Sequence, residues 1–293
     1  MTAIARLGSL LALLLAVTTG AASQEQKLGV VAAENFYGDV AQQIGGEGVE
    51  VASVLSNPNQ DPHLFETTPT IVRQIAAARI VVFNGAEYDA WMDKLLNAAP
   101  RPERTALAVA ALVNRKAGDN PHVWYDPATM PALARALAAA FGKADPAHAA
   151  DYAARLASFL ASLEPIDSKI AEIRGKYAGV AITATEPVFG YMACALGLKM
   201  RNERFQMAVM NDTEPSARDI AAFEHDLRER KVRVLLYNKQ TGTKLTQRML
   251  DIARRSKVPV VGVTETEPIG MAYQDWILAQ LAELQKALAQ PST

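Results

Sequence analysis

The sequence predicts an α/β protein with two parallel-sheet lobes joined by a long helix. Short apolar runs bounded by turn residues alternate with amphipathic stretches, which is typical of strands separated by helices and therefore of parallel sheets. This alternation occurs on both sides of a long helical stretch. Once an N-terminal leader is set aside, about 270 residues remain, which exceeds the usual size of one core and favours two domains.

The predicted strands are the short apolar runs that end at turn residues. Four of them belong to the first lobe and three to the second. They cover residues 28–33, 49–55, 80–83 and 107–112 in the first lobe and residues 180–183, 232–237 and 258–263 in the second.

The connecting helix is predicted over residues 144–177. It opens at Asp145-Pro146, because aspartate is a good N-cap and proline fits the first helical position. Pro165 should kink or break it, since proline removes a backbone hydrogen bond and clashes with the preceding turn. A buried stripe is predicted from apolar residues at spacings of three and four, namely Leu156, Phe159, Leu163, Ile166, Ile170, Ile173 and Tyr177. The predicted divisions of the chain are a leader (1–23), a first lobe (24–143), the helix and a second lobe (178–293).

The leader is predicted to be a cleavable signal peptide. Arg6 precedes an apolar run at 10–17, and small residues at 18–23 resemble a cleavage site. The run is shorter than the roughly 20 residues of a membrane-spanning helix, although the alternative is an anchor that stays attached. The only cysteine is Cys194, so the lipid-acceptor cysteine of a bacterial lipoprotein is missing and a freely diffusing, secreted protein is expected. The small apolar neighbours of Cys194 predict that it is buried in a packed helix.

The charge pattern argues against a nucleic-acid partner. The formal net charge is -1 at pH 7, and charges of both signs are mixed, so the basic stripe of a nucleic-acid binder is missing. No segment after the leader is long and apolar enough to span a bilayer. The mature protein is therefore not expected to cross a membrane.

Two of the four histidines follow predicted strands in matching contexts. His63 comes after Pro62 in the loop that follows one strand, and His122 comes after Pro121 in the loop that follows another. Ligands bind at the carboxyl edge of open parallel sheets, and the preceding proline fixes the backbone that presents each ring. Both residues could instead be solvated or hydrogen-bonded loop histidines.

Several motifs in order resemble the zinc/manganese family of solute-binding proteins of ABC transporters. They are SNPNQDPHLFE at 56–66, NG at 84–85 with Trp91 after it, NPHVW at 120–124, EPVFGY at 186–191 followed by LGL at 196–198, and EPS at 214–216. The resemblance extends from about Lys27 to Leu288. Spaced motifs in the right order are far more specific than any one of them.

The resemblance implies a metal site in the cleft between the lobes, with two ligands from each. It assigns His63 and His122 from the first lobe and Glu186 from the second. Glu186 matches the manganese-type pattern, since many zinc-type members have histidine there. The fourth family ligand is usually an aspartate near the last strand, but this chain offers Glu265 and Glu267 instead. Glu265 is preferred because it follows the strand most directly, and Glu267 stays open as the alternative.

The donor set agrees with a divalent transition metal. Two neutral imidazoles and two carboxylates neutralise a 2+ ion and include no soft thiolate. Zinc is favoured by the general affinity order, whereas the share of carboxylates suits manganese or iron. Without the resemblance, Glu186 would be explained as a helix-start residue favoured by the dipole. His148 and His225 are explained by solvated helix faces.

The function implied by the resemblance is transport, not catalysis. A periplasmic, monomeric solute-binding protein would capture zinc or manganese with high affinity and deliver it to an ABC import permease with its ATPase. One alternative is a metal-dependent hydrolase, which needs an open coordination position and a separate general base, but the sequence contains no H-E-x-x-H motif. Another is a metal-binding surface adhesin, which the missing anchor cysteine weakens.

Overall fold

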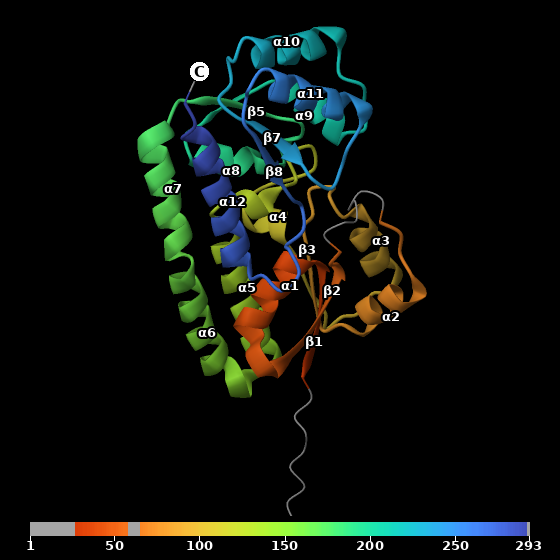
Figure 1. Cartoon of the computed structure of the whole chain (residues 1–293). Helices are drawn as coiled ribbons and strands as arrows, with labels where there is room; N and C mark the ends of the chain where they lie inside the picture. Colours follow the sequence, from red (N-terminus) through yellow and green to blue (C-terminus); the bar gives the residue numbers. More distant parts are fainter. Residues whose placement is uncertain (1–26, 58–64, 292–293) are drawn as a thin grey trace, which may run out of the picture.

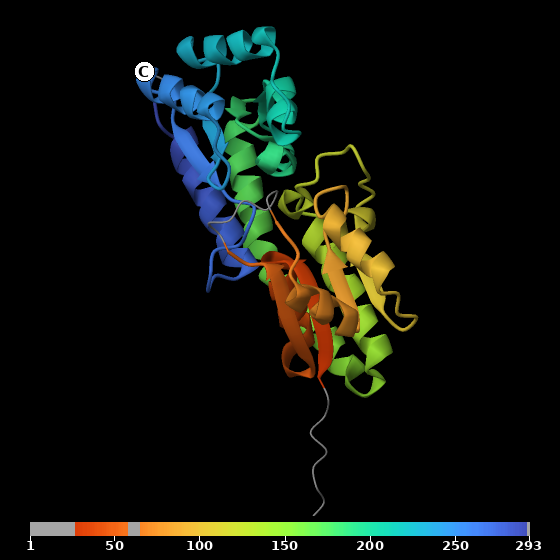
Figure 2. The ribbon, with the colours of Figure 1, turned by 90° about the vertical axis from the view of Figure 1, so that its right-hand side faces the viewer.

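The predicted fold class is confirmed by the computed structural model, which describes residues 27–57 and 65–291. Two four-stranded sheets have the orders β2-β1-β3-β4 and β6-β5-β7-β8, and all their strand pairs are parallel. The first sheet contains β1 (Leu28–Glu34), β2 (Val49–Leu55), β3 (Ile80–Phe83) and β4 (Thr105–Ala108), and the second contains β5 (Ala181–Ala184), β6 (Lys199–Arg201), β7 (Leu235–Asn238) and β8 (Val260–Val263). Figures 1 and 2 show the two lobes one above the other. The predicted leader and His63 lie outside the described residues.

Helices cover both faces of each sheet. In the first lobe, one face carries α1 (Asn35–Gly45), α5 (Thr129–Ala144) and α6 (Ala149–Ser162), and the other carries α2 (Pro69–Ala77) and α3 (Ala90–Ala98). In the second lobe, one face carries α7 (Glu164–Tyr177), α8 (Gly190–Ala195) and α12 (Tyr273–Leu288), and the other carries α9 (Glu203–Met210), α10 (Ala217–Arg228) and α11 (Lys244–Arg255). Short helical segments are η1 (Gly46–Gly48), α4 (Val109–Leu112), η3 (Val123–Tyr125), η4 (Pro146–His148) and η5 (Pro187–Phe189).

Strand β1 shows why the sheets are covered on both sides. Its side chains alternate, so that Val30 and Ala32 pack toward α1 while Val31 and Ala33 pack toward α2 and α3. All four are buried. Strands buried on both faces are expected in a parallel sheet, because the crossover helices cover both sides.

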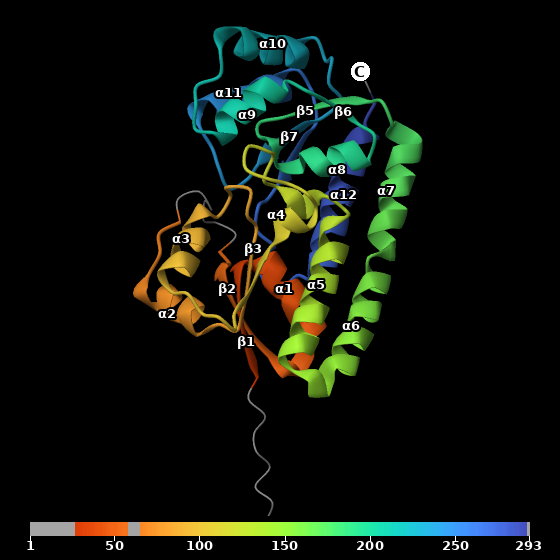
Figure 3. The same ribbon diagram turned by 180° about the vertical axis from the view of Figure 1, so that it is seen from behind.

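The connecting helix is interrupted beside Pro165, as the sequence predicts. Helix α6 ends before Leu163, and Pro165 stands in the first turn of α7, where its missing N–H has no role in the helix. Helix α6 packs on α5 and α7 packs on α12, so the pair runs along both lobes (Figure 3). In the predicted stripe, the buried residues are Phe159, Leu163, Ile166 and Ile173.

Two sequence expectations about strands were wrong. The strand predicted over residues 107–112 ends at Ala108, and residues Val109–Leu112 form α4. The reason is that β3 ends at Phe83, and the next carbonyl, that of Asn84, accepts a hydrogen bond from the N–H of Ala110 and turns the chain out of the sheet (2.8 Å). Strand β6 was missed because Lys199–Arg201 is short and has no apolar alternation.

The predicted burial of Cys194 was also wrong. The residue lies in α8 as expected, but its side chain is exposed. Met192, Ala193 and Leu196 occupy the buried face of this turn, which leaves Cys194 on the opposite side. Among the described residues, no helix is long and apolar enough to cross a bilayer.

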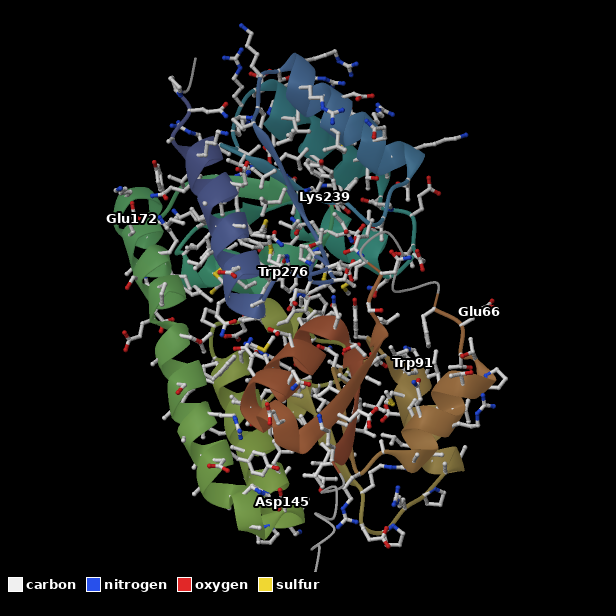
Figure 4. All side chains as sticks on the ribbon, turned by 60° about the horizontal axis from the view of Figure 1, so that its bottom comes forward. Glu66, Trp91, Asp145, Glu172, Lys239 and Trp276 are labelled. Carbon is white, nitrogen blue, oxygen red and sulfur yellow. The ribbon has the colours of Figure 1, made fainter. Side chains whose placement is uncertain are left out.

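One hydrophobic core runs through both lobes. Trp276 of α12 is buried, and its ring lies 5.7 Å from that of Phe36 and 5.6 Å from that of Tyr125, both in the first lobe. Tyr273 of the same helix donates its hydroxyl to the carbonyl of Trp124 at 2.9 Å. Figure 4 shows Trp276 near the centre of the molecule. The last helix of the chain therefore fastens the second lobe to the first.

We predict that Trp276→Ala lowers the free energy of unfolding by about 3–5 kcal/mol, the usual cost of truncating a buried tryptophan. Because the ring belongs to a core shared by both lobes, calorimetry should show one transition that moves to lower temperature. The exposed change Val72→Ala is the control and should shift stability by less than about 0.5 kcal/mol. Two transitions, of which only one moves, would contradict a shared core.

Candidate metal centre

The carboxyl edges of the two sheets meet, and the predicted site residues stand there. Glu186 follows the end of β5 by two residues, and Glu265 follows the end of β8 by two. His122 ends the loop that follows β4 and α4. Ligand sites in open parallel sheets form at this edge. His63 follows β2 but lies outside the described residues.

The imidazole of His122 is oriented through its Nδ1 atom. Its ring is fully buried, and Nδ1 lies 2.6 Å from Oδ1 of Asn120. The amide of Asn120 is itself oriented, because its Nδ2 donates to the carbonyl of Pro187 at 2.7 Å, so Oδ1 can only accept. Nδ1 therefore carries a proton, which leaves Nε2 as the ring nitrogen that could bind a metal ion. Nε2 has no hydrogen-bond partner among the described residues.

Glu265 brings the two lobes into contact. Its Oε2 lies 3.5 Å from Nε2 of His122 and accepts a hydrogen bond from the hydroxyl of Tyr88 at 2.9 Å. Both partners belong to the first lobe, whereas Glu265 belongs to the second. Its Oε1 accepts from the side-chain amide of Asn238. Because the Glu265 side chain is fully buried, its carboxylate depends on these donors in place of water.

Glu186 is joined to Glu265 through one amide. Nδ2 of Asn238 donates to Oε2 of Glu186 at 2.9 Å, and the hydroxyl of Thr241 donates to Oε1. Burial raises the pKa of the Glu186 carboxyl above its ordinary value, and the nearby charge of Glu265 raises it further, while the two donors oppose the shift. The site is therefore a buried arrangement of two carboxylates and one imidazole.

The described part of the chain does not supply a complete set of ligands by itself. Among residues 27–57 and 65–291, no three His, Cys, Asp or Glu side chains are gathered closely enough to hold a metal ion. His122 and Glu265 are in contact, and Glu186 reaches them only through Asn238. The structure thus brings His122 and Glu265 into contact and links Glu186 to them through Asn238, and the donor types fit a divalent transition metal.

Glu267 points to a different neighbourhood. Its N–H donates to Oδ1 of Asn35 at 3.1 Å, and its carbonyl accepts from Nδ2 of Asn35 at 2.7 Å. Burial, followed by the charge of Asp39, raises the pKa of the Glu267 carboxyl to about 9. The backbone of Glu267 is therefore bound to α1, and its carboxyl lies near Asp39 of the same helix.

Three partner residues of the site were missed in the sequence. Asn120 orients His122, Tyr88 donates to Glu265, and Asn238 joins the two carboxylates. A signal was present for two of them. Asn120 belongs to the same short motif as His122, and Asn238 is a polar residue that ends a buried apolar run.

A second pair of buried acids lies beside the site in the first lobe. Glu34 ends β1 and is fully buried, and no donor among the described residues reaches its carboxyl oxygens. Asp89 accepts from the N–H groups of Asn84 at 2.5 Å and Gly85 at 2.8 Å. Burial, then the charge of Asp89, raises the pKa of Glu34 well above its ordinary range. Burial raises the pKa of Asp89 to about 6 against these backbone donors.

Comparison with known proteins identifies one family whose model matches most of the chain. Residues 30–287 match the family model described as ZnuA, zinc-uptake complex component A, periplasmic. The manganese-binding lipoprotein MntA of Bacillus subtilis is 25% identical over 243 residues, which cover 79% of this chain and 78% of that protein. The manganese ABC transporter substrate-binding lipoprotein PsaA of Streptococcus mitis is 23% identical over 292 residues, covering 92% and 91%.

The fold is also shared with a solved structure. The periplasmic zinc-binding protein TroA from Treponema pallidum superposes with a TM-score of 0.77 at 19% sequence identity. The match covers 90% of this chain and 100% of that one. At this level of identity the likeness establishes the two-lobed architecture.

We predict that Glu34→Gln makes stability less dependent on pH. The protonated Glu34 carboxyl contributes to the stability of the wild type in full below its ordinary pKa of 4.5. This contribution is lost as the pH rises from 4.5 through the raised pKa of the folded protein. At pH 8 the free energy of unfolding of the variant, measured by urea titration, should therefore exceed that of the wild type by on the order of 1 kcal/mol or more. This difference in free energy should shrink toward pH 4.5. Glu50→Gln, on an exposed position of β2, is the control. Equal pH profiles for Glu34→Gln and wild type would contradict the prediction.

Proposed function

Because the chain belongs to the ZnuA family of periplasmic zinc-uptake components, we propose that it is the metal-binding, substrate-binding protein of an ABC importer. It captures a divalent transition-metal ion, zinc or manganese, and delivers it to a membrane permease driven by an ATPase. The names of its relatives support this proposal, since MntA is manganese-binding and PsaA is a manganese ABC transporter substrate-binding lipoprotein. Metal is the cargo, so the chemistry is binding and release.

One observation supports this proposal most directly. Nε2 of the buried His122 imidazole lies 3.5 Å from Oε2 of Glu265, across the boundary between the lobes. A second buried carboxylate, that of Glu186, lies one amide away. Buried charged groups of this kind are stable only when they are paired or bind a cation.

The proposed ligands are His63 and His122 from the first lobe and Glu186 and Glu265 from the second. Two imidazoles and two carboxylates neutralise a 2+ ion. Glu265 is proposed over Glu267 because the carboxylate of Glu265 contacts His122, whereas the carboxyl of Glu267 lies near the charge of Asp39 in α1. Tyr88 and Asn120 would orient two of the ligands through hydrogen bonds, as partner residues around metal sites commonly do.

We also propose how the protein reaches the periplasm. We propose that residues 1–23 act as a signal peptide and are removed, and that the mature protein works as a monomer in the periplasm. Several relatives are lipoproteins, but the only cysteine of this chain is Cys194, in α8. The intact mass of the secreted protein would show directly whether the leader is removed and whether a lipid is attached.

We predict that His122→Ala lowers the affinity for zinc and for manganese by at least about tenfold, since loss of an inner ligand costs about 1.4 kcal/mol or more. The same loss is expected for His63→Ala. Competition titration against a chelator measures both constants. His225→Ala is the matched control, because His225 is exposed and its Nε2 lies beside Nζ of Lys231.

The fold should be retained in all three variants, as circular dichroism would check. If both His122→Ala and His63→Ala bind metal as tightly as the control, the proposed site is wrong. If the wild type binds neither zinc nor manganese, the proposed function is wrong.

We predict that Glu265→Gln lowers metal affinity by on the order of tenfold or more, whereas Glu267→Gln changes it by less than about twofold. Glutamine keeps the shape of the side chain but removes the negative charge that would neutralise the ion, and only Glu265 contacts His122. Zinc and manganese titrations of both single variants and of the double variant decide the assignment. A larger loss for Glu267→Gln would move the fourth ligand by two residues.

A further inference from the structure

Asn238 stands between the two carboxylates of the second lobe because of the strand order. Strand β7 lies between β5 and β8, and Asn238 is its last residue, paired in register with Val263. Glu186 follows β5 and Glu265 follows β8. The side chain at the end of the middle strand is therefore placed between the side chains that follow its two neighbours. Lys239, the next residue, marks this end of β7 in Figure 4.

The amide group of Asn238 uses both of its N–H bonds on these carboxylates. Nδ2 donates to Oε2 of Glu186 at 2.9 Å and to Oε1 of Glu265. Its orientation is fixed from behind, because Oδ1 accepts from the N–H of Gln240 at 3.0 Å. The side chain is buried. An amide turned the other way would place Oδ1 against two carboxylates, so the NH₂ group must face them.

The Asn238 amide partly replaces a cation between the two carboxylates. Two carboxylates close together in a buried site repel each other, and at least one of them resists ionisation unless positive charge lies between them. The two partially positive hydrogens of the Asn238 amide supply that charge in a weaker form. A metal ion bound by Glu186 and Glu265 would bind the same two carboxylates and would supply in full the positive charge that the amide supplies in part.

We propose that Asn238 is a placeholder for the metal. It holds Glu186 and Glu265 together until the ion arrives and then gives up its hydrogen bonds to them. This inference rests on the proposed function. Asn238 thereby sets a threshold for binding, because the ion must displace two charge-assisted hydrogen bonds. It also favours release, because the same bonds reform when the ion leaves.

The opposite role would leave a different signature. If Asn238 kept its hydrogen bonds in the loaded protein, it would orient the ligands, and its removal would weaken metal binding. If it is a placeholder, its removal raises the free energy of the metal-free protein alone, so binding becomes tighter. The sign of the change in affinity therefore separates the two roles.

The test compares Asn238→Ala with the wild type by competition titration with Zn²⁺ alone and with Mn²⁺ alone. Zinc affinity should rise by on the order of tenfold, which corresponds to the loss of competing charge-assisted hydrogen bonds. The melting temperature of the chelator-treated variant should fall more than that of the zinc-loaded variant. Asn97→Ala is the matched control, because Asn97 is an exposed asparagine of α3 in the first lobe. It should not tighten binding.

A second measurement uses the wild type and does not depend on how the variant folds. In protein labelled with ¹⁵N on asparagine, the side-chain NH₂ signal of Asn238 should move on addition of Zn²⁺, and its hydrogens should exchange faster with water. A signal that stays unchanged through saturation with zinc, or weaker zinc binding by Asn238→Ala, would overturn the placeholder role. A wild type that binds neither metal would instead overturn the proposed function, and this inference with it.

Discussion

The rest of the site depends on the hydrogen bonds made by the side chain of Asn120. This side chain accepts from Nδ1 of His122 and donates to the carbonyl of Pro187, so one amide orients the imidazole and ties it to the turn that carries Glu186. The hydroxyl of Tyr191 donates to the carbonyl of Asn120 at 2.7 Å. A Cβ atom at Gly190 would lie 3.0 Å from Nδ2 of Asn120, so glycine there leaves room for this contact. The NPHVW motif at 120–124 and the EPVFGY motif at 186–191 are thus partners across the lobe boundary.

Other polar contacts repeat this arrangement along the boundary. The hydroxyl of Tyr125 donates to the carbonyl of Thr264 at 2.8 Å, and the N–H of Tyr273 donates to Asp39 at 2.9 Å. Each contact joins a group at the carboxyl edge of one sheet, or beside it, to the opposite lobe. Polar groups buried here need partners, and the partners come from the other half of the chain. The site and the interface between the lobes are therefore stabilised by the same hydrogen bonds.

The sequence predicted the fold class and the edge of the sheets at which the site lies, because apolar runs identify buried strands and parallel sheets bind ligands where those strands end. It also predicted one site for His122, Glu186 and Glu265. In the structure His122 contacts Glu265, and Glu186 is linked to Glu265 through the amide of Asn238. It did not predict Tyr88 and Asn238 as their partners. Such pairs are separated by many residues along the chain and depend on how the sheets face each other, which periodicity does not encode. The exposure of Cys194 was missed for a related reason, since small apolar neighbours do not tell which face of a short helix is covered.

The aromatic side chains shared by the two lobes limit how the molecule can move. Swinging the lobes fully apart would expose Trp276 together with Phe36 and Tyr125, which are buried against one another. Large aromatic side chains bury about 150–250 Å² each, and exposure costs about 25 cal/mol per Å², so a wide opening would cost on the order of 10 kcal/mol. That is comparable to the whole stability of a typical domain. The aromatic core shared by the two lobes therefore restricts their relative motion to small displacements.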